Sequence, residues 1–477
     1  MTLRTSDDSQ GHAAAIAAAP APAAARAPAV FVTGSTMRHV INMTVTGSIG
    51  LMAIFLVDFL SLLYVSWLGN PAATAGVGFA TLVLFLATSV NIGFLIAVSA
   101  LAAKELGAGR KQRAREMAGS TIFLMVVCSA IVTAALLVVM PLLLRWLGAT
   151  GEAYDIAYRF LWICLPSNVL MALGMGYSGA LRAVGDAKKA MYVTLSGGLV
   201  TAGLDPLLIF SFGLGTDGAA IATVISRLCF VIVGYWGAVH VHDMVAKPQA
   251  SHLGTDTKLA TVIALPAVLT NLATPIANIF VASTMSQFGD KAVAASAIMD
   301  RIVPVAFGVL FALSGAVGPI LGQNWGARRF DRMQSVMKDA TIFCAAYVVP
   351  MWFILMLGQN QIVDLFQVTG LTADLIRLFT VLSGPMWLTL GGLFVANAAF
   401  NNLGFPLYST AFNWGRATIG TLPMVWLGAH YGGAQGALIG MAAGGAIFGI
   451  VALIVAFRTI TTLRRAADKQ AMAQPHS

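Results

Sequence analysis

Twelve long apolar stretches, separated by short polar connections, account for most of the chain. They cover roughly residues 40–68, 73–103, 117–145, 154–182, 188–212, 216–243, 257–287, 291–322, 330–357, 372–402, 404–430 and 434–462. A helix that crosses the hydrocarbon core of a bilayer needs about 20 apolar residues, and each stretch reaches that length. The pattern therefore predicts an all-α integral membrane protein with twelve transmembrane helices.

A polar linker at residues 244–256 divides the predicted helices into two sets of six. We expect a disordered Ala/Pro-rich tail over residues 1–38, an N-terminal six-helix lobe over 39–243, a C-terminal six-helix lobe over 257–462 and a second tail over 463–477. Prolines interrupt the apolar residues of the first tail, which argues against a cleaved signal peptide.

Short motifs recur in the two halves at an offset of 218 (436 − 218) to 220 (288 − 68) residues. The recurring motifs pair Leu68–Gly69 with Phe288–Gly289, Gly107–Lys111 with Gly326–Arg329, and Gly218–Ala222 with Gly436–Gly440. An even number of helices in each half gives both repeats the same orientation. We expect two lobes related by a pseudo-two-fold axis along the membrane normal, with a cavity between them.

The composition excludes a soluble protein. Only 10% of the residues are charged and 58% are hydrophobic, whereas soluble domains have roughly 25% charged residues. The net charge of +9 lies in short loops that lack the aromatic pattern of a nucleic-acid surface. We expect these loops to contact membrane lipids, and we expect no nucleic-acid partner.

The placement of Lys and Arg predicts the orientation in the membrane. One side of the predicted helices holds 21 of them, Arg182 included, and the other side holds four. Loops with an excess of Lys and Arg face the cytoplasm. We therefore expect a multi-pass protein of the plasma (inner) membrane with both termini cytoplasmic.

Two acids lie deep inside apolar stretches, at Asp58 and Asp205. An ionisable residue at membrane depth is expensive to desolvate and is therefore a functional candidate. The apolar surroundings favour the neutral acid, which suits a group that binds and releases a proton. Thr201 lies one helical turn before Asp205. The alternatives are structural: Asp205 satisfies the helix break at Pro206, and Asp58 pairs with Arg227 or a backbone group.

The repeat places these acids in one half only. At the same offset, Asp58 corresponds to Asn278 and Asp205 falls beside Leu422. The N-terminal lobe is therefore the predicted site of cation coupling. Asp300 and Arg301 form a second deep charged pair, for which structural pairing with other helices is favoured over a transport role.

Polar, aromatic and Met residues within the spans are candidates for the substrate cavity: Asn168, Tyr177, Asn271, Asn278, Asp300, Arg301, Met386, Trp387, Asn397 and Trp414. The alternative for the amides is interhelical hydrogen bonding, and for the aromatic residues ordinary packing. The chain has 21 Met and 26 Phe, which would give adaptable walls for varied apolar substrates. The four Cys and seven His show no metal-ligand spacing, and no nucleophile–base set indicates an enzyme.

Three motifs, taken in order, resemble the multidrug and toxic compound extrusion (MATE) family over about residues 40–460. They are GALRAVGDAK at Gly179–Lys188, LDPLLIF at Leu204–Phe210 and GAAIAT at Gly218–Thr223. The resemblance implies twelve helices in two six-helix lobes. It also implies drug efflux driven by inward flow of H⁺ or Na⁺.

Within that family the chain most resembles the DNA-damage-inducible (DinF-like) branch, whose cation site uses acids on helices 1 and 5. The resemblance assigns these roles to Asp58 and Asp205, and a helix-6 threonine to Thr223. Thr201 stands where the branch has a helix-5 asparagine, and the loss of that amide ligand favours H⁺ over Na⁺. The other major branch has acids in the C-terminal lobe, where this chain has Thr274 on helix 7 and no acid on helix 10.

The sequence thus predicts a cation-coupled antiporter, using H⁺ rather than Na⁺, that exports drugs or other amphipathic organic compounds by alternating access. We expect a monomer with no enzymatic activity, no metal site and no cofactor beyond the coupling ion. The alternative is a related flippase for lipid-linked precursors or oligosaccharides. It would need cations in the central cavity, for which Arg227, Arg301 and Arg416 are the candidates.

Overall fold

The computed structural model describes residues 29–473, which contain long helices and no strand. The parts of the predicted tails at 1–28 and 474–477 lie outside the described residues. The first half comprises η1 (Val30–Val32), α2 (Thr36–Ser66), α3 (Pro71–Gly107), α4 (Lys111–Trp146), α5 (Gly151–Cys164), η2 (Leu165–Ser167), α6 (Asn168–Val184), α7 (Ala187–Pro206), η3 (Leu207–Ser211), α8 (Gly215–Tyr235) and η4 (Trp236–Val241). The second half comprises α9 (Ala250–Ser286), α10 (Asp290–Gly326), α11 (Phe330–Leu357), α12 (Gln359–Leu365), α13 (Leu371–Leu403), α14 (Pro406–Gly415), η5 (Arg416–Thr421) and α15 (Leu422–Ala473).

The last apolar segment, Pro406–Lys469, is 64 residues long and crosses the membrane twice. It is one of 11 described helical segments that are long and apolar enough to span a bilayer. Gly433 breaks it with φ 60° and ψ −145°, a conformation that only glycine adopts readily. Beyond the break the chain folds back on itself, and the two backbones meet closely. A Cβ on Gly428 would clash with the carbonyl oxygen of Gly436, and a Cβ on Gly436 would clash with the carbonyl oxygen of Gly428. The prediction of twelve transmembrane helices is confirmed.

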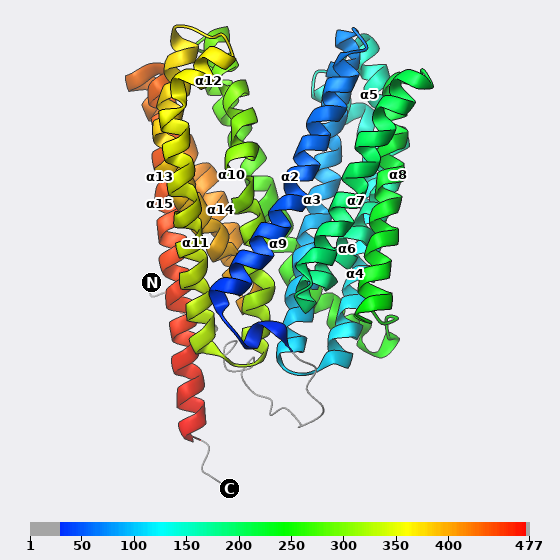
Figure 1. Ribbon diagram of the computed structural model, residues 1–477, viewed down its shortest axis with the longest axis vertical. Coiled ribbons are helices and arrows are strands. Elements are labelled where there is room, and N and C mark those ends of the chain that lie inside the picture. The colour runs from blue at the N-terminus through cyan, green and yellow to red at the C-terminus, as the bar shows by residue number, and fades with distance from the viewer. Residues whose placement is uncertain (1–28, 474–477) are drawn as a thin grey trace, which may run out of the picture.

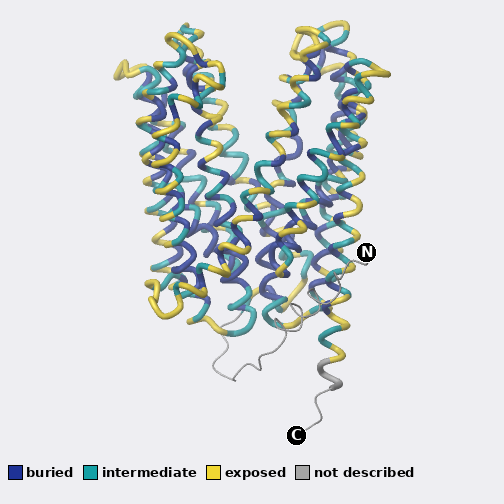
Figure 2. The backbone as a smooth tube through the Cα atoms, turned by 180° about the vertical axis from the view of Figure 1, so that it is seen from behind, coloured by how far each residue is buried: buried dark blue, intermediate teal, exposed yellow. Residues whose placement is uncertain are grey.

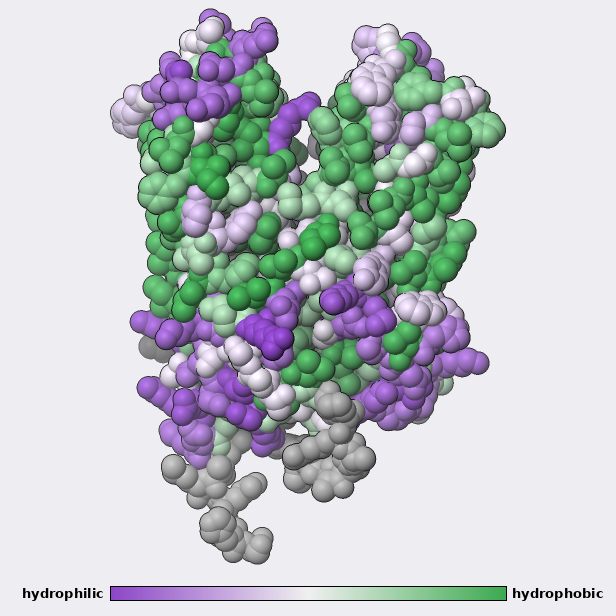
Figure 3. Space-filling model, viewed as in Figure 1, coloured by the Kyte–Doolittle hydropathy of each residue, from purple (hydrophilic) through white to green (hydrophobic). Residues whose placement is uncertain are grey.

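The helices form two lobes that separate toward one end of the molecule (Figure 1). The space-filling view retains a notch between the lobes there, above a broad apolar belt (Figure 3). The opposite end holds both described chain ends and the α3–α4 and α10–α11 connections, and we call it the closed end. Buried positions concentrate where the lobes meet toward the closed end (Figure 2).

Two helices cross between the lobes. In Figure 1, α2 slants from one lobe toward the other, and it packs against α7 of its own lobe and against α10 and α11 of the opposite lobe. Likewise α9 packs against α14 and α15 of its own lobe and against α3 of the first lobe. The first helix of each half therefore belongs to both lobes, which agrees with the predicted pseudo-symmetry.

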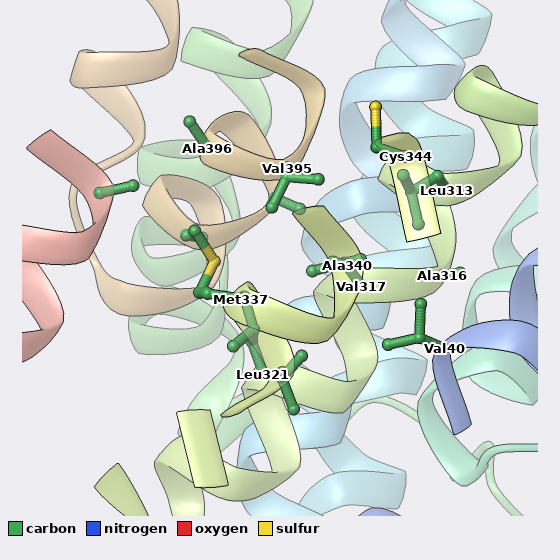
Figure 4. Packing of buried hydrophobic residues seen from close by; sticks show 14 of the residues in the cluster. Val40, Leu313, Ala316, Val317, Leu321, Met337, Ala340, Cys344, Val395 and Ala396 are labelled. Carbon is green, nitrogen blue, oxygen red and sulfur yellow. The ribbon is translucent and has the colours of Figure 1, made fainter. Parts of the chain in front are cut away.

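The core of the second lobe includes side chains from α2. Val40 lies beside Ala316 of α10 (Figure 4), and it belongs to one buried cluster with Val317 of α10 and Met337 of α11. Val40 is 0% exposed, and burial of one such aliphatic side chain contributes about 1.5–3 kcal/mol. The closed-end half of α2 is thus fixed to the second lobe by packing.

The closed end is sealed by glycines at equivalent positions of the two repeats. A Cβ on Gly107 of α3 would clash with the carbonyl oxygen of Gln323, and a Cβ on Gly326 of α10 would clash with the carbonyl oxygen of Lys104. Both pairs are related by the same offset of 219 residues (326 − 107 and 323 − 104). The backbones of α3 and α10 therefore meet across the pseudo-two-fold axis, with no room for any side chain at the glycines.

The segment before α2 is ordered and bridges the lobes. Phe31 in η1 is 1% exposed, and its ring lies against Gly185 in the α6–α7 connection of the first lobe. Its backbone N–H donates to Oε1 of Gln323 at 2.8 Å, and its carbonyl oxygen accepts from Asn324 and Arg332 of the second lobe. The prediction of disorder is therefore wrong for residues 30–38. Within the apolar Val-Phe-Val sequence that follows the Ala/Pro-rich stretch, Phe31 is the residue buried at the closed end.

Replacing Phe31 by Ala is expected to speed amide hydrogen exchange of residues 30–34, because the ring that holds the segment against Gly185 is lost. A buried Phe contributes about 3–5 kcal/mol to local packing. Hydrogen exchange read by mass spectrometry measures the effect, with Val30→Ala as the control because Val30 is 44% exposed. Equal exchange in both variants would contradict the bridging role.

Candidate functional site: a charged cluster in the first lobe

Asp205 lies at the end of α7, inside the first lobe, and is 1% exposed. One carboxylate oxygen accepts a hydrogen bond from the hydroxyl of Ser61 on α2. The other oxygen, Oδ1, has no hydrogen-bond partner within residues 29–473. Pro206 follows, and the helix widens into the π-turn η3, a distortion frequent at functional sites. The arrangement leaves one carboxylate oxygen free to hold a proton or a cation.

Asp58 lies on α2, one turn before Ser61, and is exposed. It is within electrostatic reach of both Arg227 and Asp205. The structure thus brings together the two acids that the sequence singled out. Ser61 was not predicted, although its position three residues after Asp58 places both on one helix face and was the available signal.

Arg227 of α8 is the fixed positive charge of this cluster. It is 7% exposed, and its Nη1 donates to the carbonyl oxygen of Cys164 and to Oγ of Ser167, both at 2.9 Å. These acceptors lie where η2 interrupts the α5–α6 span and leaves backbone and hydroxyl groups available. Arg227 is therefore held by the first lobe itself, with Asp58 as its acidic neighbour.

The two predicted threonines flank the cluster. Thr201 is 8% exposed and donates its hydroxyl proton to the carbonyl oxygen of Gly197 at 3.1 Å. Thr223 donates to the carbonyl oxygen of Ala219 at 3.0 Å. Because both protons are bound to backbone carbonyls, neither hydroxyl donates to an acid in this conformation.

The amides predicted for the substrate cavity include two that lie inside the lobes. Asn168 is buried, donates to Ser129 at 2.8 Å and accepts from Asn91 at 2.9 Å. Asn397 is buried in the second lobe and accepts from Asn413 at 3.0 Å. The contacts of Asn168 and Asn397 are therefore interhelical hydrogen bonds, which was the alternative considered from the sequence.

All three aromatic residues predicted for the cavity also pack within a lobe. Tyr177 is 8% exposed and packs edge-on against Tyr235. Trp387 is 4% exposed and stacks on Phe307. Trp414 donates from its indole nitrogen to a backbone carbonyl of α9. The hydrophobic character of these residues in the sequence does not show whether they pack inside a lobe or line a cavity.

The remaining candidates are more accessible. Asn278, Asp300 and Arg301 are exposed, on α9 and α10, and Met386 and Asn271 are half-buried. Asp300 and Arg301 do not form an ion pair with each other. Neither forms one with any other residue that the structure describes. The predicted structural pairing of these two charges is therefore absent from this conformation.

A small cavity lies between the lobes, on the closed-end side of the notch. Its volume is about 10 Å³, room for about one water molecule. Side chains and glycines of α2, α6, α7 and α10 line it, among them Met43, Gly47, Arg182, Thr194 and Gly315. None of the predicted cavity residues lines it. Arg182, counted from the sequence among the basic residues of one membrane side, lies in the contact between the lobes.

Known proteins resemble the chain over nearly its whole length. The MatE family model matches residues 48–207 and 266–427. The FAD transporter of Shewanella oneidensis is 25% identical over 428 residues, which cover 88% of this chain and 94% of that protein. The probable multidrug resistance protein YoeA of Bacillus subtilis is 24% identical over 383 residues, covering 76% of this chain and 81% of that one.

Solved structures share the fold. The Vibrio cholerae MATE transporter VcmN matches with a TM-score of 0.85 at 23% identity, covering 89% of this chain and 96% of that chain. A multidrug resistance MATE family transporter in an outward-facing conformation matches with a TM-score of 0.86 at 22% identity, covering 93% and 100%. Two six-helix lobes, a crossing first helix in each and a family model that matches both halves lead to one assignment: this multi-pass membrane protein belongs to the MatE family of transporters.

Proposed function

We propose that the protein is an H⁺-coupled antiporter that exports small amphipathic organic compounds. The observation that carries this proposal is Asp205, a buried carboxylate with one unpartnered oxygen next to the exposed Asp58. Relatives named as multidrug resistance proteins support the substrate class. The coupling ion needs no cofactor, and the protein acts as a monomer.

The ligands available in the cluster favour H⁺ over Na⁺. The fixed positive charge of Arg227, within electrostatic reach of Asp58, opposes H⁺ and Na⁺ alike, so the preference depends on which ligands each ion needs. Thr201 supplies no amide oxygen. A proton, which binds to a single carboxylate oxygen, requires none of the additional ligands that a metal cation needs.

The hydrogen bond between Ser61 and Asp205 connects the cluster to the rest of the molecule. Ser61 lies on α2, whose closed-end half packs in the second lobe through Val40 and Met43. Protonation of Asp205 changes this contact, and the displacement of α2 is transmitted to the closed end. Gly50 permits close packing of α2 on α7, since a Cβ there would clash with Thr194. Export requires that proton binding and substrate binding oppose each other.

The proposed orientation places the closed end in the cytoplasm. The basic connections at residues 108–110 and 327–329 lie at this end, and such loops remain cytoplasmic. Both termini are then cytoplasmic, and the notch between the lobes opens to the outside. Protons from outside reach Asp58 through the open end.

Proteoliposomes with either a proton gradient or a Na⁺ gradient, imposed one at a time, test the proposal. We expect export of ethidium, an amphipathic dye, with the proton gradient alone. The readout is dye fluorescence, and liposomes without protein are the control. Transport driven by Na⁺ with the pH equal on both sides would contradict H⁺ coupling.

FAD and a lipid-linked precursor are two other substrates to test in the same assay. The relative from Shewanella oneidensis is named for FAD, an anionic compound, and Arg182 is a cation between the lobes that suits such a substrate.

The lipid-precursor flippase is less favoured. Arg227 is inside the first lobe, and Arg416 donates to Thr274 at 2.9 Å in the second, so two of its three candidate cations lie away from the inter-lobe cavity.

A further inference from the structure

Arg182 in the last turn of α6 is an arginine without a counter-charge between the lobes. Its guanidinium lines the inter-lobe cavity and lies so close to α10 that a Cβ on Gly315 would clash with it. Its side chain is half-buried, and no carboxylate lines the cavity. Within the described chain, no hydrogen bond or ion pair engages Arg182.

The other arginines at membrane depth differ in this respect. Arg227 donates to Cys164 and Ser167, and Arg416 donates to Thr274. The acid closest to Arg182 in sequence, Asp186, is already engaged by Lys189 at 2.7 Å and His242 at 2.8 Å. Removing an unpaired charge from water is costly even when the side chain is half-buried as Arg182 is, and such a group normally has a partner.

We propose that Arg182 binds the anionic group, a phosphate or a carboxylate, of an organic substrate that this transporter carries. The proposal rests on the proposed export function and adds the substrate class and the residue that recognises it. The planar guanidinium fits both oxyanions because it donates two parallel N–H groups to two oxygens.

The closed cavity explains how the anion would leave. A volume of about 10 Å³ holds about one water molecule and no organic anion. Gly315 allows α10 to approach the guanidinium, since a Cβ there would clash with it, and Gly47 of α2 also lines the cavity. The anion therefore binds while the lobes are apart at this end, and closure of the lobes removes its space and displaces it.

Riboflavin and riboflavin 5′-phosphate test the proposal, because they share one ring system and differ by a phosphate. Binding to the purified full-length protein is read from flavin fluorescence. We expect the phosphate to bind about 10-fold more tightly or better, as a charge-assisted hydrogen bond implies. Arg182→Gln is expected to abolish this preference and Arg182→Lys to retain part of it. Arg465→Gln is the matched control, because Arg465 is an exposed arginine of α15 that does not line the cavity.

A second arm distinguishes a substrate anion from a lipid headgroup. Binding is repeated in nanodiscs of phosphatidylcholine with and without phosphatidylglycerol. If the anionic lipid weakens phosphate binding in the wild type and not in Arg182→Gln, the arginine is an oxyanion site that a lipid headgroup also occupies. Equal affinity for the two flavins in the wild type, or an unchanged preference in a folded Arg182→Gln protein, overturns the proposal. An arginine that only stabilises the C-terminal end of α6 gives that result.

The binding assay needs no ion gradient. A protein that prefers the phosphate but shows no proton-driven export refutes the coupling and leaves the anion site in place. A protein that exports ethidium with a proton gradient but does not distinguish the two flavins refutes the anion site alone.

Discussion

Replacing Asp205 by Asn is expected to reduce proton-driven export to the level of liposomes without protein. The amide is nearly isosteric and still accepts the hydrogen bond from Ser61, but it cannot bind and release a proton at the free oxygen. Asp58→Asn should have the same effect, because the exposed acid passes the proton between the open end and Asp205. Efflux of ethidium from proteoliposomes measures both.

The control for these variants is Asp300→Asn. Asp300 is an exposed acid on α10, outside the charged cluster, and its replacement should leave coupling intact. Binding of ethidium without a gradient separates coupling from substrate binding, and both Asn variants should retain it. Full proton-driven export by Asp58→Asn and Asp205→Asn together would refute the role of the cluster. Ser61→Ala should have a smaller effect, since one hydrogen bond is worth about 0.5–1.5 kcal/mol.

Adding one methyl group at Gly107 or Gly326 is expected to prevent tight closure of the lobes. Each new Cβ would clash with a backbone carbonyl oxygen, which cannot rotate away as a side chain would. Overpacking of this kind costs about 1–3 kcal/mol, and only the closed arrangement is affected. The closed-to-open ratio at this end should fall roughly 5- to 150-fold, with a corresponding loss of export.

Spin labels on the α3–α4 and α10–α11 connections would report this change as a longer inter-lobe distance. Gly78→Ala is the matched control on the same helix, because a Cβ at Gly78 meets no atom within 4 Å. An unchanged distance distribution in Gly107→Ala and Gly326→Ala would show that the glycine contact does not determine closure.

Much of the architecture followed from the sequence because lipid imposes simple requirements. A stretch of about 20 apolar residues must be helical to satisfy its backbone in the bilayer, so hydropathy alone defined the crossing segments. The repeat showed that the halves are equivalent, and the contact between Gly107 and Gln323 and its counterpart between Gly326 and Lys104 confirms the pseudo-symmetry. The cost of a buried charge made Asp58 and Asp205 conspicuous, and the structure places them in one cluster.

The contents of the cavity did not follow from the sequence, because side chains of similar polarity serve packing and binding alike. Asn168 and Asn397 find amide or hydroxyl partners on neighbouring helices, and hydropathy does not show which helix faces them. Arg182, the last residue of the predicted span 154–182, was counted with the basic residues of one membrane side, whereas the structure directs its guanidinium between the lobes.

The sequence by itself determined the membrane class, the number of helices, their repeat and the acids available for coupling, since each depends on local composition or on spacing along the chain. Only the tertiary structure decided which groups meet. The contact between Ser61 and Asp205 joins residues 144 apart, and that between Phe31 and Gln323 joins residues 292 apart. Such contacts arise from the packing angles of whole helices, in particular the crossing of α2 and α9 between the lobes. These angles depend on the surfaces of two helices at once, which no single stretch of sequence specifies.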